Sequence, residues 1–289
     1  SVLVYSNVQK QTNLLNYDSV NKILIKNQIL APVLIEQNYD KNFIEIKDFG
    51  NKNMLNKIKS SKNKLKEYKK ILKILNKIQK IKKFKTKNFL KKKFNLPNYT
   101  KTKLLKESYL FLEWYLSANK SINQKKVLKK NLKKIIENLY SKLRLKQKVF
   151  VHRDFHVSNM MFYKGKIAII DTQDAVLGNP TYDLASLVDD VRIKTSNSLK
   201  ANILKDFLTN VKCKNKSQYI NDFEILSVLR NLKIIGIFTR LAKRDKKIKY
   251  LKLIPHAWKL IDNRIKNNPN LNDLKNFLIK YPKIKKNEN

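Results

Sequence analysis

The segment from Val149 to Asp190, VFVHRDFHVSNMMFYKGKIAIIDTQDAVLGNPTYDLASLVDD, carries the strongest structural and chemical signal in this sequence. A short apolar run at its start predicts a strand. The loop that follows holds Asp154 and Asn159, five residues apart. A second apolar run, Lys166-Ile167-Ala168-Ile169-Ile170, predicts another strand and is followed directly by Asp171.

This set of side chains is typical of a phosphoryl-transfer centre. Such a centre needs a carboxylate to orient and deprotonate the attacking hydroxyl, together with oxygen ligands that hold Mg²⁺ on the phosphates. Asp154 can provide the carboxylate, and Asn159 with Asp171 can provide the ligands, because Mg²⁺ needs only one or two protein carboxylates besides water and phosphate oxygens. Asp174 is expected to be either a third metal ligand or a brace for its loop.

The alternative is that the spacing arose by chance, since an Asp after a strand often only forms a turn or caps a helix. The order of the features argues against chance. A strand, a polar loop, an Asn, a hairpin through Lys164-Gly165, a second strand and an Asp follow one another. This combination favours the functional interpretation.

The same segment resembles the aminoglycoside phosphotransferase and choline kinase superfamily, which comprises small-molecule relatives of the protein kinases. Within it, HRDFHVSN, IIDTQDA and TYDLASLVDD are most similar to the bacterial N-acetylmuramate/N-acetylglucosamine anomeric kinases. The resemblance implies a catalytic base at Asp154, metal ligands at Asn159 and Asp171, and use of ATP with Mg²⁺. Thr172 departs from the pattern, because that position is usually aromatic.

The length and composition limit the classes of protein to which this chain can belong. With 289 residues the chain can bury a substantial core. The formal net charge of +42 would normally indicate a nucleic acid or an anionic membrane as partner. Only seven of the 64 basic residues are arginine, however, and the lysines are spread along most helices. Nucleic-acid readers favour Arg, so we expect no nucleic-acid role.

Cys213 is the only cysteine, which excludes a disulfide framework and a cysteine zinc site. No apolar run approaches the length of a membrane span, and no leader peptide is visible. We therefore expect a cytoplasmic, soluble and monomeric protein without a membrane partner.

The beginning of the chain predicts a truncated nucleotide-binding lobe. The sequence opens directly into an apolar strand, Val2 to Tyr5, and none of the four glycines can form a loop over nucleotide phosphates. The resemblance also implies a phosphate-binding Lys on this strand and a Glu on the next helix, and both are missing. We expect a fragment, or a relative whose first strands have been lost.

Strand and hairpin signals continue to the end of this first part. A short helix is predicted from Asn16 to Asn27, and residues 33–35 and 42–46 read as a hairpin. Lys47 to Gly50 should form a hinge. By resemblance, Ile46, Lys47 and Asp48 would contact the adenine edge of ATP. A plain strand-to-helix turn is the alternative.

Helical spacing dominates beyond the hinge. The recurrence of apolar residues at intervals of three and four predicts amphipathic helices whose lysines face solvent. The predicted helices span residues 61–83, 103–118, 125–143, 198–211 and 223–243, with one starting at Tyr182 and two more within 253–281.

Two of these helices resemble the anomeric kinases in LLKESYLFLEWYL and LRNLKIIGIFTRLAKRD. Aromatic faces and carboxylates could contact a sugar there, and cations on an apolar helix need snorkelling or an anion. The alternative is that these side chains belong to the core. The expected substrate-binding residues are Arg153, Glu107, Trp114, Arg230, Lys233 and Arg240.

The predicted fold class is α+β, a two-lobed protein-kinase-like fold. A truncated N-terminal sheet lobe would span residues 1–49 and a large helical catalytic lobe residues 50–289. The expected function is ATP-dependent phosphorylation of the anomeric hydroxyl of an amino sugar in cell-wall sugar recycling. The alternatives are a kinase of another small alcohol, such as an aminoglycoside or choline, a nucleotide-binding pseudokinase, or a basic RNA-associated protein.

Overall fold

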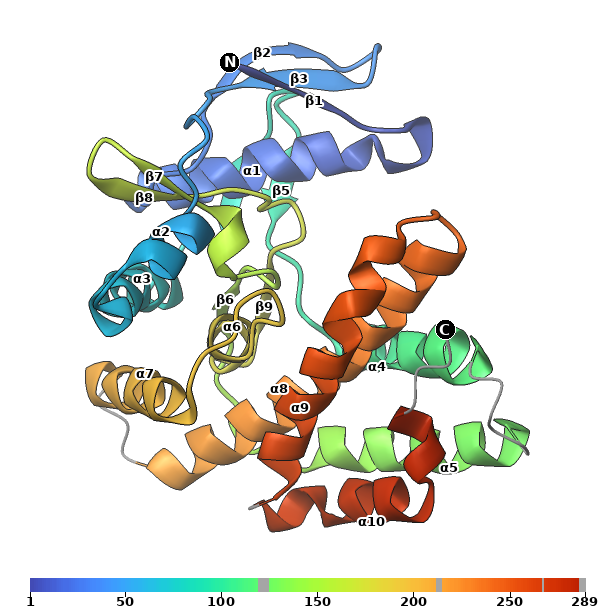
Figure 1. Ribbon diagram of the computed structural model, residues 1–289. Helices are drawn as coiled ribbons and strands as arrows, with labels where there is room; N and C mark the ends of the chain where they lie inside the picture. Colours follow the sequence, from blue (N-terminus) through green and yellow to red (C-terminus); the bar gives the residue numbers. More distant parts are fainter. Residues whose placement is uncertain (119–124, 212–214, 267, 286–289) are drawn as a thin grey trace. The chain divides into compact units, whose positions relative to one another are not determined.

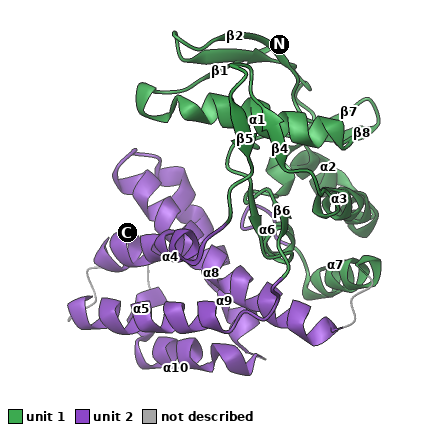
Figure 2. Ribbon diagram, turned by 180° about the vertical axis from the view of Figure 1, so that it is seen from behind, with its two compact units in different colours: residues 1–98, 147–188, 195–213 green, residues 99–146, 189–194, 214–289 purple. Residues whose placement is uncertain are grey.

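The computed structural model describes residues 1–118, 125–211, 215–266 and 268–285, so Cys213 lies outside the described residues. The chain divides into two compact units (Figure 1 and Figure 2). The first comprises Ser1–Asn98, Gln147–Val188 and Thr195–Cys213. The second comprises Tyr99–Lys146, Asp189–Lys194 and Lys214–Asn289.

The first unit begins with the predicted sheet and helix. Strands β1 (Val2–Tyr5), β3 (Phe43–Ile46) and β2 (Leu34–Asn38) form an antiparallel sheet in the order β1-β3-β2. Helix α1 (Thr12–Lys26) lies along one face of this sheet (Figure 1). Leu14 and Tyr17 of α1 pack against the inward side chains of β3, which confirms the predicted helix and hairpin.

This unit also contains α2 (Met54–Ser60), α3 (Lys64–Gln79) and α7 (Asn197–Asn210). The predicted apolar stripe of α3 is buried at Ile71, Leu72, Leu75 and Ile78. The lysines between these positions face solvent, as the helical spacing predicts.

The central segment supplies two short strand pairs and a helix. Strand β6 (Val149–Val151) pairs with β9 (Val176–Gly178), and β7 (Met160–Tyr163) pairs with β8 (Lys166–Ile169). Helix α6 (Tyr182–Val188) follows. The turn between β7 and β8 has φ values of 45° at Lys164 and 76° at Gly165, and a tight hairpin turn needs this left-handed pair.

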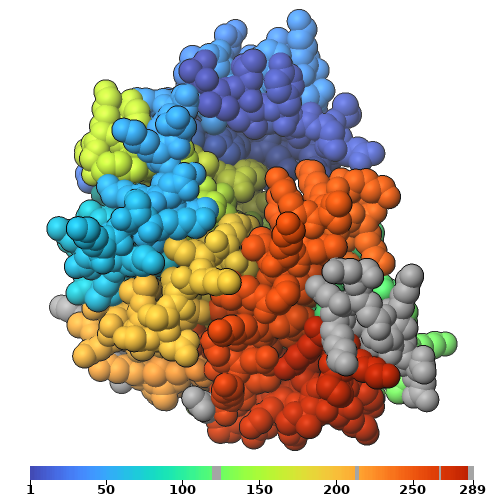
Figure 3. All heavy atoms as spheres, viewed as in Figure 1, coloured from blue at the N-terminus to red at the C-terminus, as the bar shows by residue number. Residues whose placement is uncertain are grey.

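The hairpin of β7 and β8 is anchored to the chain that follows β3. The Phe162 amide donates to the Lys52 carbonyl at 2.7 Å, and Asn53 forms an isolated bridge with Met161. The yellow-green hairpin borders the light-blue segment around α2 in Figure 3. The β7–β8 hairpin, which precedes Asp171, is therefore joined to the chain between β3 and α2.

The two units do not divide the chain at residue 49. The Ile169 amide donates to the Leu30 carbonyl at 2.8 Å, which ties the N-terminal segment to β8 within the first unit. The division into residues 1–49 and 50–289 stays a prediction about lobes.

One hairpin was not predicted from the sequence. Strands β4 (Lys85–Lys87) and β5 (Lys93–Asn95) pair antiparallel in a stretch for which no strand was predicted. Their three-residue length and lysine-rich sequence give no apolar alternation, so the sequence carries no strand signal there.

The second unit is helical, as predicted. The Lys103–Ala118 prediction is met by an α-helix that passes into a π-helix, at Phe111–Leu116. None of the described helices combines the length and the apolar character that a membrane span requires. The α-helices are α4 (Lys101–Leu110), α5 (Lys125–Ser141), α8 (Lys216–Lys243), α9 (Ile254–Ile265) and α10 (Asn272–Lys280).

Gly236 allows α8 to cross the end of α4 at close range. A Cβ placed on Gly236 would lie closer than 3.0 Å to the backbone atoms of Leu110 and Phe111. This contact coincides with the change from α-helix to π-helix at Phe111. The crossing is therefore set by backbone contact, which a larger residue would separate.

We expect Gly236→Ala to lower the free energy of unfolding by about 1 to 3 kcal/mol, because an added methyl group overpacks the crossing. Ala is otherwise better than Gly in a helix interior by about 1 kcal/mol, so the sign of the change is diagnostic. Urea denaturation followed by circular dichroism measures it. A more stable variant would show that the two helices can separate without cost.

Candidate active site

The backbone of the loop after β6 is held by one buried carboxylate. Asp183, at the start of α6, is 0% exposed and accepts hydrogen bonds from the backbone amides of His152 (2.7 Å) and Arg153 (3.0 Å). Arg153 has a φ of 75°, an uncommon conformation for a side chain of this size. Asp183 therefore braces the loop.

His152 is fully buried in the same loop and contacts the segment that leads from β8 to Asp171. Its Nε2 lies 3.0 Å from the Ile170 carbonyl, which makes Nε2 the protonated nitrogen. Burial lowers the pKa of His152, while the carboxylates of Asp154, Asp171 and Asp174 act in the opposite direction. A neutral imidazole therefore links the two halves of the site.

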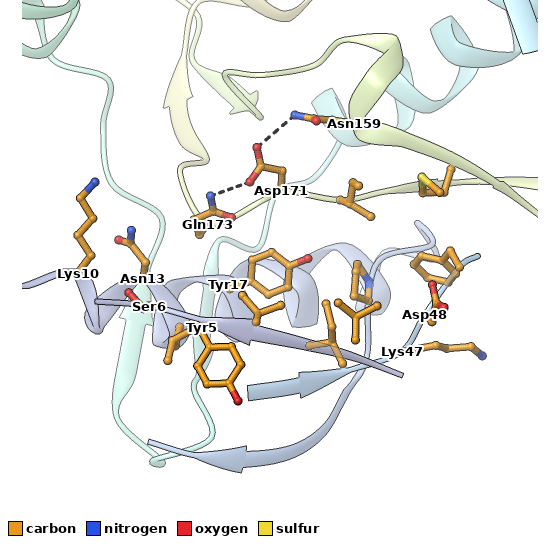
Figure 4. A pocket seen from close by; sticks show the side chains of 18 of the residues that line it. Tyr5, Ser6, Lys10, Asn13, Tyr17, Lys47, Asp48, Asn159, Asp171 and Gln173 are labelled. Atoms are coloured by element: carbon orange, nitrogen blue, oxygen red, sulfur yellow. Dashed lines mark hydrogen bonds between the residues drawn. The ribbon is translucent and has the colours of Figure 1, made fainter. Parts of the chain in front are cut away.

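Asn159 connects the loop of Asp154 to the carboxylate of Asp171. Its Nδ2 donates to the backbone carbonyl of Asp154 at 3.1 Å and to Oδ2 of Asp171 at 3.3 Å. Gln173 donates to the other oxygen of Asp171 at 2.9 Å (Figure 4). These bonds bring the Asp154 backbone, Asn159 and the Asp171 carboxylate together from the two ends of a hairpin.

Helix α1 contributes residues that sequence reasoning missed. Thr172 donates from Oγ1 to Oδ1 of Asn21 at 2.6 Å. Burial raises the pKa of Tyr17 to about 12, although hydrogen bonds with the Asp171 backbone and the Asn21 side chain lower it. Tyr17 and Asn21 are one helical turn apart on an otherwise apolar face, and this polar spacing is the signal that could have identified them.

Asp174 and Arg153 are engaged with each other. Arg153 Nη1 lies 3.0 Å from Oδ1 of Asp174 and also donates to the Asp174 carbonyl at 3.1 Å. This pair favours the loop-brace alternative for Asp174, and its role as a metal ligand stays a prediction. The predicted substrate role of Arg153 likewise stays a prediction.

A cavity of about 680 Å³ opens beside these residues. Asn159, Asp171 and Gln173 line one wall, and Tyr17, Asn13 and Lys10 line another (Figure 4). Strand β1 and the segment Ile46–Gly50 complete the lining, so the predicted adenine-contacting residues Ile46, Lys47 and Asp48 share the cavity with the predicted metal ligands.

The donor chemistry fits Mg²⁺. Among the described residues no group of three or more His, Cys, Asp or Glu side chains could hold a metal ion. A kinase-type site does not need one, since an amide oxygen, a carboxylate and phosphate oxygens are all hard ligands. Asn159 would present its Oδ1 to the ion after its amide rotates, and Asp171 would supply a carboxylate oxygen.

The second unit holds most of the expected substrate residues. Oε2 of Glu107 accepts from the Tyr99 hydroxyl at 2.5 Å and lies 2.7 Å from Nζ of Lys233. Arg230, on the same helix as Lys233, is 3% exposed, and Arg240 is partly buried. The structure therefore pairs Glu107 with Lys233, and the contribution of these residues to substrate binding stays a prediction.

Trp114 and Tyr115 occupy different environments. Trp114 is half-buried, whereas Tyr115 is buried between Phe111 and Trp258, with ring centroids 5.1 and 5.9 Å away. Nε1 of Trp258 donates to the Tyr115 hydroxyl, and burial raises the pKa of Tyr115 to about 12. Tyr115 thus belongs to the core, which was the alternative considered from sequence.

Solved structures and one family share this architecture. The choline/ethanolamine kinase family protein from Mesorhizobium loti superimposes with a TM-score of 0.62 at 9% identity, covering 92% of this chain and 83% of that one. The ADP-bound aminoglycoside phosphotransferase APH(2'')-Ib gives 0.59 at 14% identity, covering 91% and 86%. The fold is therefore the α+β, two-lobed, protein-kinase-like fold of small-molecule kinases.

Residues 65–213 match the phosphotransferase enzyme family, and the chain belongs to that family. It is similar to the N-acetylmuramate/N-acetylglucosamine kinase of Neisseria meningitidis serogroup B, with 32% identity over 160 residues. That match covers 53% of this chain and 47% of the relative, so the chain spans about half the length of the relative.

We expect Asp183→Asn to lower the free energy of unfolding by about 2 to 4 kcal/mol, because two buried amides lose a charged acceptor. Urea denaturation measures the loss. Asp206→Asn is the matched control, since Asp206 forms a partly exposed ion pair with Lys69 at 3.3 Å, which should contribute less than about 1 kcal/mol. Equal losses in the two variants would contradict the bracing role.

Proposed function

We propose that this protein uses ATP to phosphorylate the anomeric hydroxyl of an amino sugar, N-acetylmuramate or N-acetylglucosamine. The observation that carries the proposal is that Asn159, which bonds to the backbone of Asp154 and to the carboxylate of Asp171, lines with Asp171 a cavity also lined by Ile46, Lys47 and Asp48. The membership in the phosphotransferase family and the similarity to a kinase of these two sugars support it.

Asp154 is the proposed general base. Its backbone carbonyl accepts hydrogen bonds from Asn159 and from the amide of His156 at 2.9 Å, so the loop backbone is held in place at Asp154. The carboxylate would accept the proton of the anomeric hydroxyl as that oxygen attacks the γ-phosphoryl group. The products would be a sugar 1-phosphate and ADP.

Asn159 and Asp171 are the proposed ligands of Mg²⁺, which when bound offsets the charge of the transferred phosphoryl group. The cavity would hold the nucleotide, with the Ile46–Asp48 backbone at the adenine edge. ADP in the related aminoglycoside phosphotransferase supports nucleotide use. Because phosphoryl transfer is mainly a matter of positioning, a small number of fixed side chains suffices.

We expect Asp154→Asn to lower kcat by about 10² to 10⁴-fold and to leave the affinity for nucleotide unchanged, because the carboxylate acts on the acceptor hydroxyl. Coupled ADP-release kinetics on the full-length protein measure both quantities. Asp40→Asn makes the same chemical change in the exposed turn between β2 and β3 and serves as control. An unchanged kcat in Asp154→Asn would refute the assignment of the base.

A reaction that makes a sugar 1-phosphate from these two sugars fits cell-wall sugar recycling in the cytoplasm, where ATP is available. The substrate that accepts the phosphoryl group distinguishes an amino-sugar kinase from the alternative functions. A preference for choline or an aminoglycoside would move the protein to another branch of the superfamily. Nucleotide binding without transfer to any acceptor would make it a pseudokinase.

The cations of α8 generate a prediction on acceptor choice. N-acetylmuramate carries a lactyl carboxylate that N-acetylglucosamine lacks, and Arg230 and Lys233 lie on one face of the helix. An Arg fork that meets a carboxylate in a partly desolvated site contributes about 1.5 to 3 kcal/mol. Arg230→Ala or Lys233→Ala should therefore raise KM for N-acetylmuramate by about one to two decades and change KM for N-acetylglucosamine far less.

Steady-state kinetics on both sugars test this, with Lys243→Ala as control, because Lys243 is an exposed cation near the end of the same helix. Equal changes for both sugars would mean that Arg230 and Lys233 bind phosphate or brace the fold. For Lys233 that outcome would point to its ion pair with Glu107.

A further inference from the structure

Helix α1 and the metal segment are joined by a buried polar contact that the proposed chemistry does not use. Oγ1 of Thr172 donates to Oδ1 of Asn21 at 2.6 Å, across 151 residues of sequence. Thr172 is 0% exposed and Asn21 is 3% exposed. A buried polar pair costs desolvation that two aliphatic side chains would avoid, so its presence calls for a physical reason.

The contact has a second polar side chain beside it on the same face of α1. Tyr17, one helical turn before Asn21, is buried and lines the same cavity as Asp171. Helix α1 therefore holds Thr172 through the Asn21 side chain and borders Asp171 through Tyr17. All four residues lie within the first unit.

Asp171 needs support from its neighbours because its backbone conformation is unfavourable. Its φ is 62°, in the left-handed region that is unfavourable for a residue with a Cβ. On the N-terminal side, the Ile170 amide donates to the Asn159 carbonyl at 3.1 Å, and the Ile170 carbonyl accepts from His152. On the C-terminal side, the Thr172 hydroxyl is bound by Asn21. Loss of the contacts on either side would allow the Asp171 carboxylate to turn away from Asn159.

We infer that Asn21 and Thr172 are a positioning pair for the Asp171 carboxylate, through which helix α1 sets the geometry of the metal ligands. This inference rests on the proposed function, in which Asp171 binds Mg²⁺. Neither residue is a proposed metal ligand, and neither lines the cavity. Their effect is transmitted through the backbone of Asp171, as with groups that orient the ligands of other metal sites.

The test measures Mg²⁺-dependent nucleotide binding, which is a readout other than activity. Isothermal calorimetry on the full-length protein compares a non-hydrolysable ATP analogue with and without Mg²⁺. Thr172→Val removes the hydroxyl at nearly constant volume, and we expect it to weaken Mg²⁺-dependent binding by about tenfold or more. Binding without Mg²⁺ should not change. Thr172→Ser keeps the hydroxyl and should restore most of the affinity.

The partner variant Asn21→Leu gives a second, independent measurement if Thr172→Val does not fold. The double variant Asn21→Leu/Thr172→Val should lose less affinity than the two single changes together, because both remove the same hydrogen bond. Additive losses would mean that the two side chains act separately and would overturn the pairing.

Ser19→Ala is the matched control for stability. Ser19 is 0% exposed on the same helix and donates to the Leu15 carbonyl at 2.8 Å, a contact internal to α1. This variant should lose stability without a change in the dependence on Mg²⁺. A loss of Mg²⁺-dependent binding as large as that of Thr172→Val would show that the effect comes from destabilised α1.

The outcomes separate this inference from the proposed function. Wild-type Mg²⁺ dependence in folded Thr172→Val would overturn the positioning role and leave the proposed kinase activity intact. Mg²⁺-dependent nucleotide binding that falls in Thr172→Val, in a protein that phosphorylates no sugar, would support the positioning role while refuting the proposed function. A wild-type protein without Mg²⁺-dependent nucleotide binding would overturn both.

Discussion

The buried carboxylate of Asp183 is the contact on which the site depends most. It accepts hydrogen bonds from two backbone amides of a loop in which Arg153 has a left-handed backbone conformation. Without an acceptor those amides would be buried and unpaired, and the loop would relax toward water. Asp154 and Asn159 follow directly in the same loop, so the carboxylate at the start of α6 sets the position of residues that lie up to 31 residues earlier in the chain.

The first unit holds the segment from Ile170 to Thr172 from two sides. The loop binds Ile170 through His152 and the Asn159 backbone, and α1 binds Thr172 through Asn21. These contacts come from distant parts of the sequence and meet within one hairpin and its flanks. A polar network of this kind is stabilising only when its members are satisfied, and it then specifies one arrangement rather than several.

The second unit is organised around different buried charges. Asp189 is 1% exposed and accepts from Ser227 Oγ at 2.5 Å and from both Nε and Nη2 of Arg264, at 2.8 and 3.1 Å. Such a bidentate pair fixes direction as well as distance. The same unit pairs Glu107 with Lys233, so this cation of the apolar helix α8 has a defined ionic contact. The large excess of lysine elsewhere lies mainly on solvated helix faces, where it does not affect the fold.

The sequence by itself determined the fold class, most helices and the chemical character of the site, because these are carried by local signals. The spacing of apolar residues predicts α3 and α8, and HRDFHVSN with IIDTQDA predicts a loop and a metal segment around a hairpin. The hairpin of β4 and β5 gave no such signal, since three-residue lysine-rich strands show no alternation. Only the tertiary structure decided that Asn21 meets Thr172, that Asp174 pairs with Arg153 and that Tyr115 is core. These contacts depend on which distant segments pack together, and local periodicity contains no information on that packing.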